Sequence, residues 1–305
     1  MDKTTLVSVI IPTRDRPNFV VRAVRSALAQ TYRHLEVLVV IDGPDPATEK
    51  SVEQLRDTRL KVIALTDPVG AAEARNIAVQ SARGRWIAFL DDNDEWLPEK
   101  TELQVERATG SAYPYPIVGV QMWARNNSYQ LIWPRTEPHH PLSEYLLARD
   151  SCSYGEGLLQ MTTLLIPRDL LAKVPFQTGL KNHRDLDWLL RAAGHDGAGI
   201  EFVPKPLAIW HQAEQRKIAS TSADWRGSLE WIDSVRPIIT ERAYASFLAT
   251  QLAPQAAREG DWGAFPLLLE RMVVTGKPNA RDLLLFFGMW SVPHAVRRIA
   301  RKARM

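Results

Sequence analysis

Trp86-Ile87-Ala88-Phe89-Leu90-Asp91-Asp92-Asn93-Asp94 is the stretch of this 305-residue chain that decides its fold. The uninterrupted apolar run predicts a strand covered on both faces of a parallel sheet. Open parallel sheets bind ligands outside the carboxyl ends of their strands, so the acids that follow are expected at the mouth of a crevice. Closely packed carboxylates repel unless a cation neutralises them, which favours a Mg²⁺ or Mn²⁺ site over a solvated acidic turn. Asp94 is also a candidate cap for the next helix.

The same alternation of strand and helix patterns fills the first hundred residues. The strands are expected at residues 6–12, 35–41, 60–65 and 85–90, and the helices at 17–28, 47–57 and 71–82. Pro17 suits the first turn of the first helix, and Asp15 is expected to cap it. Apolar strands separated by helices imply an α/β fold, with a mostly parallel central sheet flanked by helices.

Beyond residue 110 the pattern is less regular. We expect strands at residues 117–123, 160–166 and 207–210, and a helix at 185–193. From about residue 222 the apolar spacing becomes helical. The sequence therefore predicts two parts, an α/β domain over residues 1–215 and a helical C-terminal region over 216–305.

The net charge of +3 is unevenly distributed. The last nine residues contain no acid and five basic residues, which are Arg297, Arg298, Arg301, Lys302 and Arg304. Without them the chain has 33 basic and 35 acidic residues, so its body is mildly acidic. A body that binds nucleic acid would spread basic residues over a working face, and we expect no nucleic-acid partner.

Several classes of protein are excluded by what the sequence lacks. The single cysteine, Cys152, excludes an intrachain disulfide framework and a cysteine-based zinc site. The chain has no signal-peptide pattern and no apolar run of about 18 residues, so we expect a cytoplasmic protein. It also lacks the motifs of dinucleotide-binding Rossmann folds, P-loop proteins, common zinc peptidases and α/β-hydrolases.

Acids follow each of the four expected strands, as Asp15, Asp42, Asp67 and the acids of residues 91–95. An α/β fold that binds a nucleotide through acids and a metal, without a glycine-rich loop, favours a nucleotide-sugar transferase. A sugar nucleotidyltransferase is the alternative, although the loop after the first strand, residues 13–17, lacks the glycines that such an enzyme uses to hold a triphosphate.

Four segments in order resemble a family 2 glycosyltransferase of the GT-A fold. They are residues 7–13, residues 26–32 with the strand that ends in Asp42-Gly43, residues 70–76, and residues 82–94. The resemblance is close over residues 6–108 and looser to about 212. It implies a GT-A-type domain that binds a nucleotide-sugar and an acceptor, followed by the helical C-terminal region.

The resemblance implies a set of donor-binding residues. Pro12, Thr13 and Asp15 would line the nucleoside pocket. Asp42 would accept a hydrogen bond from the base, as a carboxylate can from the N3–H of uracil or thymine, so a UDP- or dTDP-sugar is favoured. Arg75 would lie near the phosphates; the alternative is an exposed helix arginine.

The resemblance also implies a divalent cation, Mg²⁺ or Mn²⁺. Asp91, Asp92 and Asn93 take the place of the family's metal-binding Asp-x-Asp signature, in which Asp91 and Asp92 also serve the nucleotide. Asn93 departs from the signature, because an amide oxygen can ligate a metal but brings no charge. His211 matches a position where the family often has a histidine near the metal and diphosphate.

Residues 181–191 are similar to the family's acceptor-side segment, in which an acid followed by an aspartate opens a helix. Asp185 falls on the position of the general base, with ordinary helix capping as the alternative. Arg184 replaces the usual preceding acid. Asp187 is expected to pair with Arg191 one turn later.

These assignments imply an inverting transferase, in which Asp185 deprotonates a hydroxyl of a glycan or lipid-linked acceptor while a nucleoside diphosphate leaves. A non-catalytic relative that binds nucleotide-sugar or glycan is an alternative, which Asn93 and Arg184 favour.

The C-terminal tail has its own pattern. Residues 283–290 are mostly apolar and predict a buried core helix. After Pro293, apolar residues fall on one side of a helix and basic residues on the rest. Such a helix is typical of a peripheral contact with an anionic membrane, with a dimer contact or a disordered tail as alternatives. The sequence does not indicate the oligomeric state.

Overall fold

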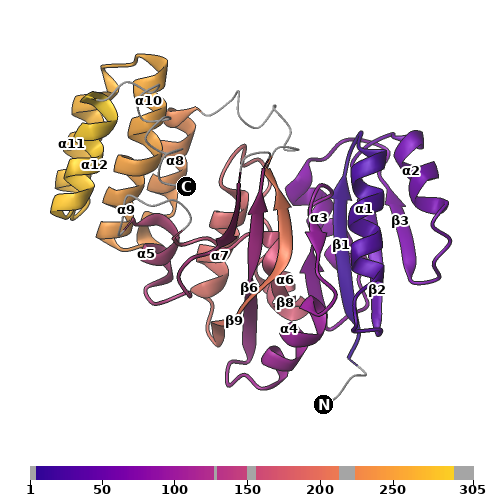
Figure 1. The fold of residues 1–305 in the computed structure, drawn as a ribbon. Coiled ribbons are helices and arrows are strands. Elements are labelled where there is room, and N and C mark those ends of the chain that lie inside the picture. Colours follow the sequence, from indigo (N-terminus) through magenta and orange to yellow (C-terminus); the bar gives the residue numbers. More distant parts are fainter. Residues whose placement is uncertain (1–4, 127–128, 150–155, 213–223, 292–305) are drawn as a thin grey trace. The chain divides into compact units, whose positions relative to one another are not determined.

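The computed structural model describes residues 5–126, 129–149, 156–212 and 224–291 (Figure 1). The chain divides into two compact units. Unit 1 comprises Met1–Trp133 and Leu159–Gln215, and unit 2 comprises Pro134–Leu158 and Arg216–Met305. Unit 2 therefore includes Pro134–Leu158, a segment from the middle of the chain. The prediction of one boundary between residues 215 and 216 had put this segment in the first domain.

The four predicted N-terminal strands form the parallel half of the sheet in unit 1. They are β1 (Val7–Thr13), β2 (Leu35–Ile41), β3 (Leu60–Ala64) and β4 (Trp86–Phe89), in the order β3-β2-β1-β4. Every residue of β2 and β4 is buried, as the apolar runs require of strands covered on both faces. The carboxyl ends of these strands carry the acids that the sequence analysis singled out.

The second half of the sheet is mixed. It continues through β8 (Leu165–Pro167), β6 (Tyr115–Arg125), β9 (Ala198–His211) and β5 (Glu95–Trp96), and β7 (Gln130–Trp133) pairs with β6. The strands β6 and β9 are parallel, whereas β8 is antiparallel to both β4 and β6. The fold is thus α/β with a mostly parallel central sheet, as predicted.

Two expected strands of this half differ from the structure. The strand expected at residues 160–166 is a 3₁₀ turn, η1 (Met161–Thr163), followed by the three-residue β8. The strand expected at residues 207–210 is the end of β9, which is 14 residues long. Pro204 and Pro206 conceal that length in the sequence, because proline interrupts a strand pattern. They lie where the pairing of β9 with β6 shifts register.

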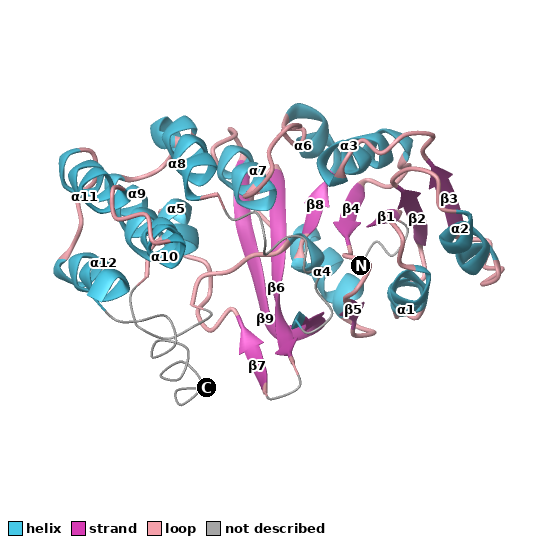
Figure 2. Ribbon diagram, turned by 90° about the horizontal axis from the view of Figure 1, so that it is seen from above, coloured by secondary structure: helices cyan, strands magenta, loops and turns pink. Residues whose placement is uncertain are grey.

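Helices cover both faces of this sheet, as Figure 2 shows. One face carries α1 (Pro17–Leu28), α2 (Pro46–Glu53) and α4 (Lys100–Thr109), and the other carries α3 (Ala71–Ser81), α6 (Arg168–Lys173) and α7 (Arg184–Ala193). The prediction that Asp15 caps α1 is wrong. Arg16 occupies the N-cap position, but its side chain makes no capping hydrogen bond to the helix, and Asp15 has a left-handed backbone (φ +55°).

Unit 2 is helical throughout its described residues. Its elements are α5 (Leu142–Leu147), α8 (Trp225–Ser234), η4 (Arg236–Ile238), α9 (Glu241–Phe247), η5 (Leu248–Leu252), α10 (Ala253–Glu259), α11 (Ala264–Val274) and α12 (Ala280–Ser291). The inserted α5 joins α9 through Glu144 and Arg242, whose charged atoms lie 3.0 Å apart. Among the described residues, no helix is long and apolar enough to cross a bilayer. The tail beyond Ser291 lies outside the described residues.

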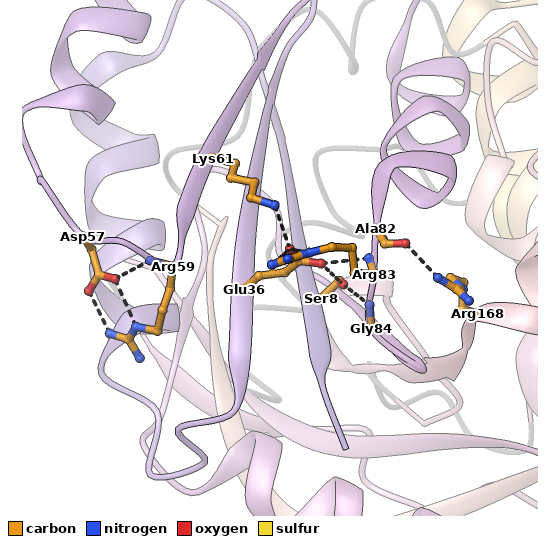
Figure 3. A network of polar contacts seen from close by, with 9 residues as sticks. All are labelled: Ser8, Glu36, Asp57, Arg59, Lys61, Ala82, Arg83, Gly84 and Arg168. Carbon is orange, nitrogen blue, oxygen red and sulfur yellow. Dashed lines mark hydrogen bonds and ion pairs between the residues drawn. The ribbon is translucent and has the colours of Figure 1, made fainter. Parts of the chain in front are cut away.

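A buried carboxylate, Glu36, fastens the edge of the sheet where β1 and β2 begin (Figure 3). Its side chain is only 2% exposed. The carboxylate accepts hydrogen bonds from Ser8 Oγ at 2.7 Å and from the backbone N–H of Arg83 at 2.8 Å. Ser8 Oγ in turn accepts from the N–H of Gly84 at 2.8 Å. Glu36 thus ties three neighbouring strands together at the edge opposite the strand-end acids.

The pKa of Glu36 is lowered. Burial raises it, but hydrogen bonds from Arg83 and Ser8 and the positive charge of Arg83 outweigh burial. A carboxyl whose pKa is lower in the folded state stabilises the fold above its unfolded pKa. That stabilisation is lost as pH falls through the folded pKa.

We predict that Glu36→Gln lowers the free energy of unfolding by about 1.5–3 kcal/mol at pH 7, the usual cost of removing a hydrogen-bonded buried charge. Urea unfolding from pH 7 to pH 3 measures it. The difference from wild type should shrink below the carboxyl's ordinary value of 4.5.

Asp57→Asn is the matched control. Asp57 pairs with Arg59, two residues along the chain, and both are about a quarter exposed. Its loss should cost under about 1 kcal/mol. Equal effects of the two variants would contradict a special role for Glu36.

Candidate functional site

The carboxylate that ends β2, Asp42, holds the start of α3. It accepts hydrogen bonds from the N–H of Val69 at 2.7 Å and of Gly70 at 3.1 Å. Gly70 is the N-cap of α3 and has φ +85°, a conformation that glycine adopts without strain. Asp42 therefore fixes the helix that carries Arg75, and its oxygens keep lone pairs for a further donor.

A second carboxylate, Asp92, is held by the loop after β1. Thr13 Oγ1 donates to its Oδ2 at 2.8 Å, and Arg16 Nη1 lies 3.0 Å from its Oδ1. The Asp92 and Arg16 side chains are each only 10% exposed. Asp15 turns elsewhere, since its N–H donates to Asp45 Oδ2 at 2.7 Å. Of the residues expected around the nucleoside, the structure thus brings Thr13, but not Asp15, into contact with Asp92.

Arg75 joins Asp91 and Asp185, two candidate residues that lie 94 positions apart. Its Nη2 lies 3.2 Å from Asp91 Oδ1 and its Nη1 lies 2.7 Å from Asp185 Oδ1. The Arg75 side chain is 6% exposed, so it is not the exposed helix arginine that was the alternative. Burial lowers the pKa of Arg75, but the charges and hydrogen bonds of Asp185 and Asp91 raise it by more, so the net direction is upward.

Aromatic rings hold the Arg75 guanidinium in place. It lies over the rings of Phe89, at 5.7 Å, and Phe176, at 5.3 Å. Asn76 clamps Phe176, because its Nδ2 donates to the Phe176 carbonyl and its Oδ1 accepts from the Phe176 N–H, both at 3.0 Å. Phe176 also stacks on Trp188 of α7 at 5.5 Å. The Arg75-Asn76 dipeptide therefore fastens α3 to the helix that carries Asp185.

Asp91 and Asp94 both have raised pKa values, caused by burial and by neighbouring negative charges. Burial of the Asp91 carboxyl raises its pKa, and the charges of Asp185 and Asp92 raise it further. The charge and hydrogen bond of Arg75 lower it, but the net direction is upward. Burial, followed by the charge of Asp91, raises the pKa of Asp94 well above its usual range. Asp94 is 1% exposed and accepts from the N–H of His211 at 3.4 Å. It does not cap α4, whose N-cap is Glu99.

His211, at the end of β9, contacts Glu95, the last acid of the run after β4. Its Nε2 lies 2.7 Å from Oε1 of Glu95, and the same oxygen lies 3.5 Å from Arg22 Nε. Arg22 Nη2 also donates to the Asn93 carbonyl at 2.6 Å. The sequence predicted no role for Arg16, Arg22 or Glu95. Glu95 had a signal, since it belongs to the acidic run at the strand end, whereas an arginine at the start or on the surface of a helix has none.

The start of α7 positions Asp185. His183, the N-cap, has a left-handed backbone with φ +62°, and burial lowers its pKa to about 4. Two residues later Asp185 reaches Arg75, while Asp187 pairs with Arg191 at 2.7 Å as predicted. The two acids of this first turn thus have different partners, and only Asp185 lies in the site.

Only some of the predicted metal ligands fit a hard cation; the predicted set is Asp91, Asp92, Asn93 and His211. Among the described residues, no three histidine, cysteine, aspartate or glutamate side chains form a metal-binding group. Both oxygens of Asp92 are engaged, and the ring of His211 faces Glu95. Asp91 and Asn93 supply oxygen donors of the type that Mg²⁺ takes beside substrate phosphates.

The proteins similar to this chain include two glycosyltransferases. The chain is 25% identical to the amylovoran biosynthesis glycosyltransferase AmsB of Erwinia amylovora over 290 residues, which cover 91% of this chain and 93% of AmsB. It is 39% identical over 100 residues to WfgD of Escherichia coli, named as a UDP-Glc:α-D-GlcNAc-diphosphoundecaprenol β-1,3-glucosyltransferase. That match covers 33% of this chain and 40% of WfgD.

Among solved structures, S. aureus TarS in complex with UDP-GlcNAc has a TM-score of 0.66 at 17% identity, over 96% of this chain and 91% of the TarS chain. This likeness concerns the fold and confirms the predicted GT-A architecture.

The model of glycosyl transferase family 2 matches residues 8–174, which is more than half of the chain. This confirms the resemblance that the strand-end motifs indicated. The chain is a GT-A glycosyltransferase and belongs to glycosyltransferase family 2.

Proposed function

We propose that this chain is an inverting transferase, which moves a sugar from a nucleoside-diphosphate sugar to a hydroxyl of a glycan or lipid-linked acceptor. The observation that carries the proposal is the bridge from Asp91 through Arg75 to Asp185. It joins the expected donor side of the site to the expected acceptor side through one buried guanidinium, while both carboxylates stay partly exposed.

Asp185 is the proposed general base. Arg75 holds its Oδ1 at 2.7 Å, and no hydrogen bond from the described residues reaches its Oδ2. The side chain is 36% exposed, so an acceptor can approach it. Oδ2 takes the proton of the acceptor hydroxyl as the new bond from oxygen to the anomeric carbon forms. The bond to the diphosphate breaks on the opposite face, so the configuration inverts.

Asp42, Pro12, Thr13 and Asp15 are the proposed nucleoside-binding residues. Supporting this, Asp42, Pro12 and Thr13 lie at the carboxyl ends of adjacent parallel strands, where such sheets bind ligands. Asp42 keeps acceptor capacity for a base N–H, so a UDP- or dTDP-sugar is the proposed donor. TarS, whose fold this chain shares, has been solved with UDP-GlcNAc.

A divalent cation, Mg²⁺ or Mn²⁺, is the proposed cofactor. Asp91 and Asn93 would hold it, with Asp92 and His211 beside them. When bound, it would offset the negative charge that develops on the leaving diphosphate. The Arg75 guanidinium contributes positive charge to the same place.

A lipid-linked acceptor is the proposed form of the second substrate. The name of WfgD states that it acts on a saccharide carried by diphosphoundecaprenol, and its match to this chain is 39% identical.

Asp185→Asn should lower kcat by about 10²–10⁴-fold, the usual contribution of a general base. The affinity for UDP, measured by calorimetry, should stay within about threefold, because no nucleotide contact is removed. Asp169→Asn is the matched control, since Asp169 is an exposed acid in the first turn of α6. Near wild-type turnover of the Asp185 variant would place the base elsewhere. Nucleotide binding without any turnover by the wild type, over a panel of donors and acceptors, would favour the non-catalytic alternative.

Arg75→Lys should lower kcat by about 10–100-fold with little change in the KM of the acceptor. Lysine keeps the charge but cannot bridge two carboxylates with a planar fork, and a lost charge-assisted hydrogen bond costs about 1.5–3 kcal/mol. Steady-state kinetics separate the two constants. The control, Arg191→Lys, alters the other arginine–aspartate pair of this region and should leave both constants unchanged. A rise in KM alone would contradict the positioning of Asp185 by Arg75.

Removal of divalent cations with EDTA should suppress transfer, and Mn²⁺ or Mg²⁺ should restore it. Asn93→Asp adds a charged oxygen ligand, so the cation concentration for half-maximal activity should fall several-fold. A cation titration of both proteins measures this. Full activity of the wild type in EDTA would show that transfer needs no divalent cation.

A further inference from the structure

Exposed apolar side chains are concentrated in one part of unit 2. Of the ten large apolar side chains that the described residues leave exposed, six lie between residues 262 and 287. They are Trp262, Leu267, Val273, Val274, Leu284 and Phe287. Exposed apolar side chains that gather in one part of a chain are a candidate interaction site, whereas scattered single residues need no explanation.

Aromatic contacts join some of these residues into one cluster, here called the aromatic edge and defined as Trp262, Phe265, Leu284, Phe287 and Trp290. Ring centroids lie 5.4 Å apart for Trp262 and Trp290 and 6.0 Å apart for Phe265 and Phe287. Trp262 is 67% exposed, Phe287 45% and Leu284 70%. The aromatic edge therefore presents to solvent a tryptophan just before α11, and a leucine and a phenylalanine one turn apart on α12.

The exposed stripe of α12 carries no charge. Ala280, Leu284, Phe287 and Ser291 are all exposed and follow one another at intervals of four, three and four residues, which places them on one side of the helix. Arg281 is the one exposed charged residue among the described residues of α12. This side of α12 is therefore suited to an apolar environment.

Positive charge follows the aromatic edge in the sequence. Trp290 contacts Trp262 and Phe265. It directly precedes Ser291, the last residue that the structure describes. Arg297 follows Ser291 by six residues and so lies within about 20 Å of it, whatever path the chain takes. Arg298, Arg301, Lys302 and Arg304 follow, without an acid among residues 292–305.

We propose that the aromatic edge docks on an anionic lipid surface, with the basic residues of the tail as its second point of attachment. Exposed tryptophan and phenylalanine insert at the level of the headgroups, and lysine and arginine are attracted to anionic lipids. Membrane affinity increases with the apolar area that is buried and with the electrostatic attraction to anionic lipids, so the two contributions together bind more tightly than either one alone. The inference rests on the proposed function in one respect, because docking brings the transferase to the membrane that holds a lipid-linked acceptor.

Flotation of the full chain with vesicles tests the proposal. The wild type should float with vesicles of phosphatidylglycerol and phosphatidylcholine, and much less with phosphatidylcholine alone or in high salt. Trp262→Ser combined with Phe287→Ser should lower the partition coefficient by about tenfold or more. Replacement of the five basic tail residues by glutamine should do the same. Val274→Ser is the matched control, because Val274 is 78% exposed on α11 but outside the aromatic edge; it should float as the wild type does.

Three results would overturn the proposal: a wild type that stays in solution with anionic vesicles, equal flotation of the double variant, or an aromatic edge that joins two copies of the chain. Light scattering after size exclusion detects the last result as a dimer that the double variant lacks. Transfer to an acceptor without a lipid chain is measured separately. Its absence would contradict the proposed function and leave the flotation result intact, and normal transfer without flotation would contradict only the docking.

Discussion

Charge repulsion at the end of β4 is the constraint on which the rest of the site depends. Asp91, Asp92 and Asp94 lie within four positions, and burial together with the neighbouring negative charges raises the pKa values of Asp91 and Asp94. Each acid is met by a different element. Arg75 of α3 pairs with Asp91, Arg16 at the start of α1 pairs with Asp92, and the N–H of His211 reaches Asp94. The acidic run therefore draws the N-terminal helices and the last strand of the sheet to one place.

The same charge balance accounts for the position of α7. Arg75 is buried, so its charge needs a second carboxylate beyond Asp91, and Asp185 supplies it. The aromatic contacts of Phe176 with Arg75 and Trp188 make this arrangement rigid, and the strained backbone of His183 aims the first turn of α7 toward it. A buried cation that joins two halves of a site defines their spacing more firmly than exposed ion pairs can.

The sequence predicted the parallel half of the sheet well, because strands buried on both faces are continuous apolar runs and amphipathic helices have a helical spacing of apolar residues. It predicted β8 and β9 poorly. A three-residue strand is too short to have a period, and Pro204 and Pro206 break the pattern of β9. In the site, strand ends identified the acids, since topology alone brings them to one edge. Their partners Arg16 and Arg22 could not be predicted, because the choice between solvent and a buried carboxylate depends on contacts between segments far apart in sequence.

The insertion of Pro134–Leu158 into unit 2 has a consequence for synthesis of the chain. Ser143 and the Thr240 whose N–H it accepts are 97 residues apart. At about 5–20 residues per second, α5 waits roughly 5–20 s on the ribosome before α9 is made. During that time the apolar side chains of α5, including Leu142, Tyr145 and Leu146, which are buried in the finished protein, lack their partner. This short helix consequently offers apolar surface to a chaperone until α9 has been made.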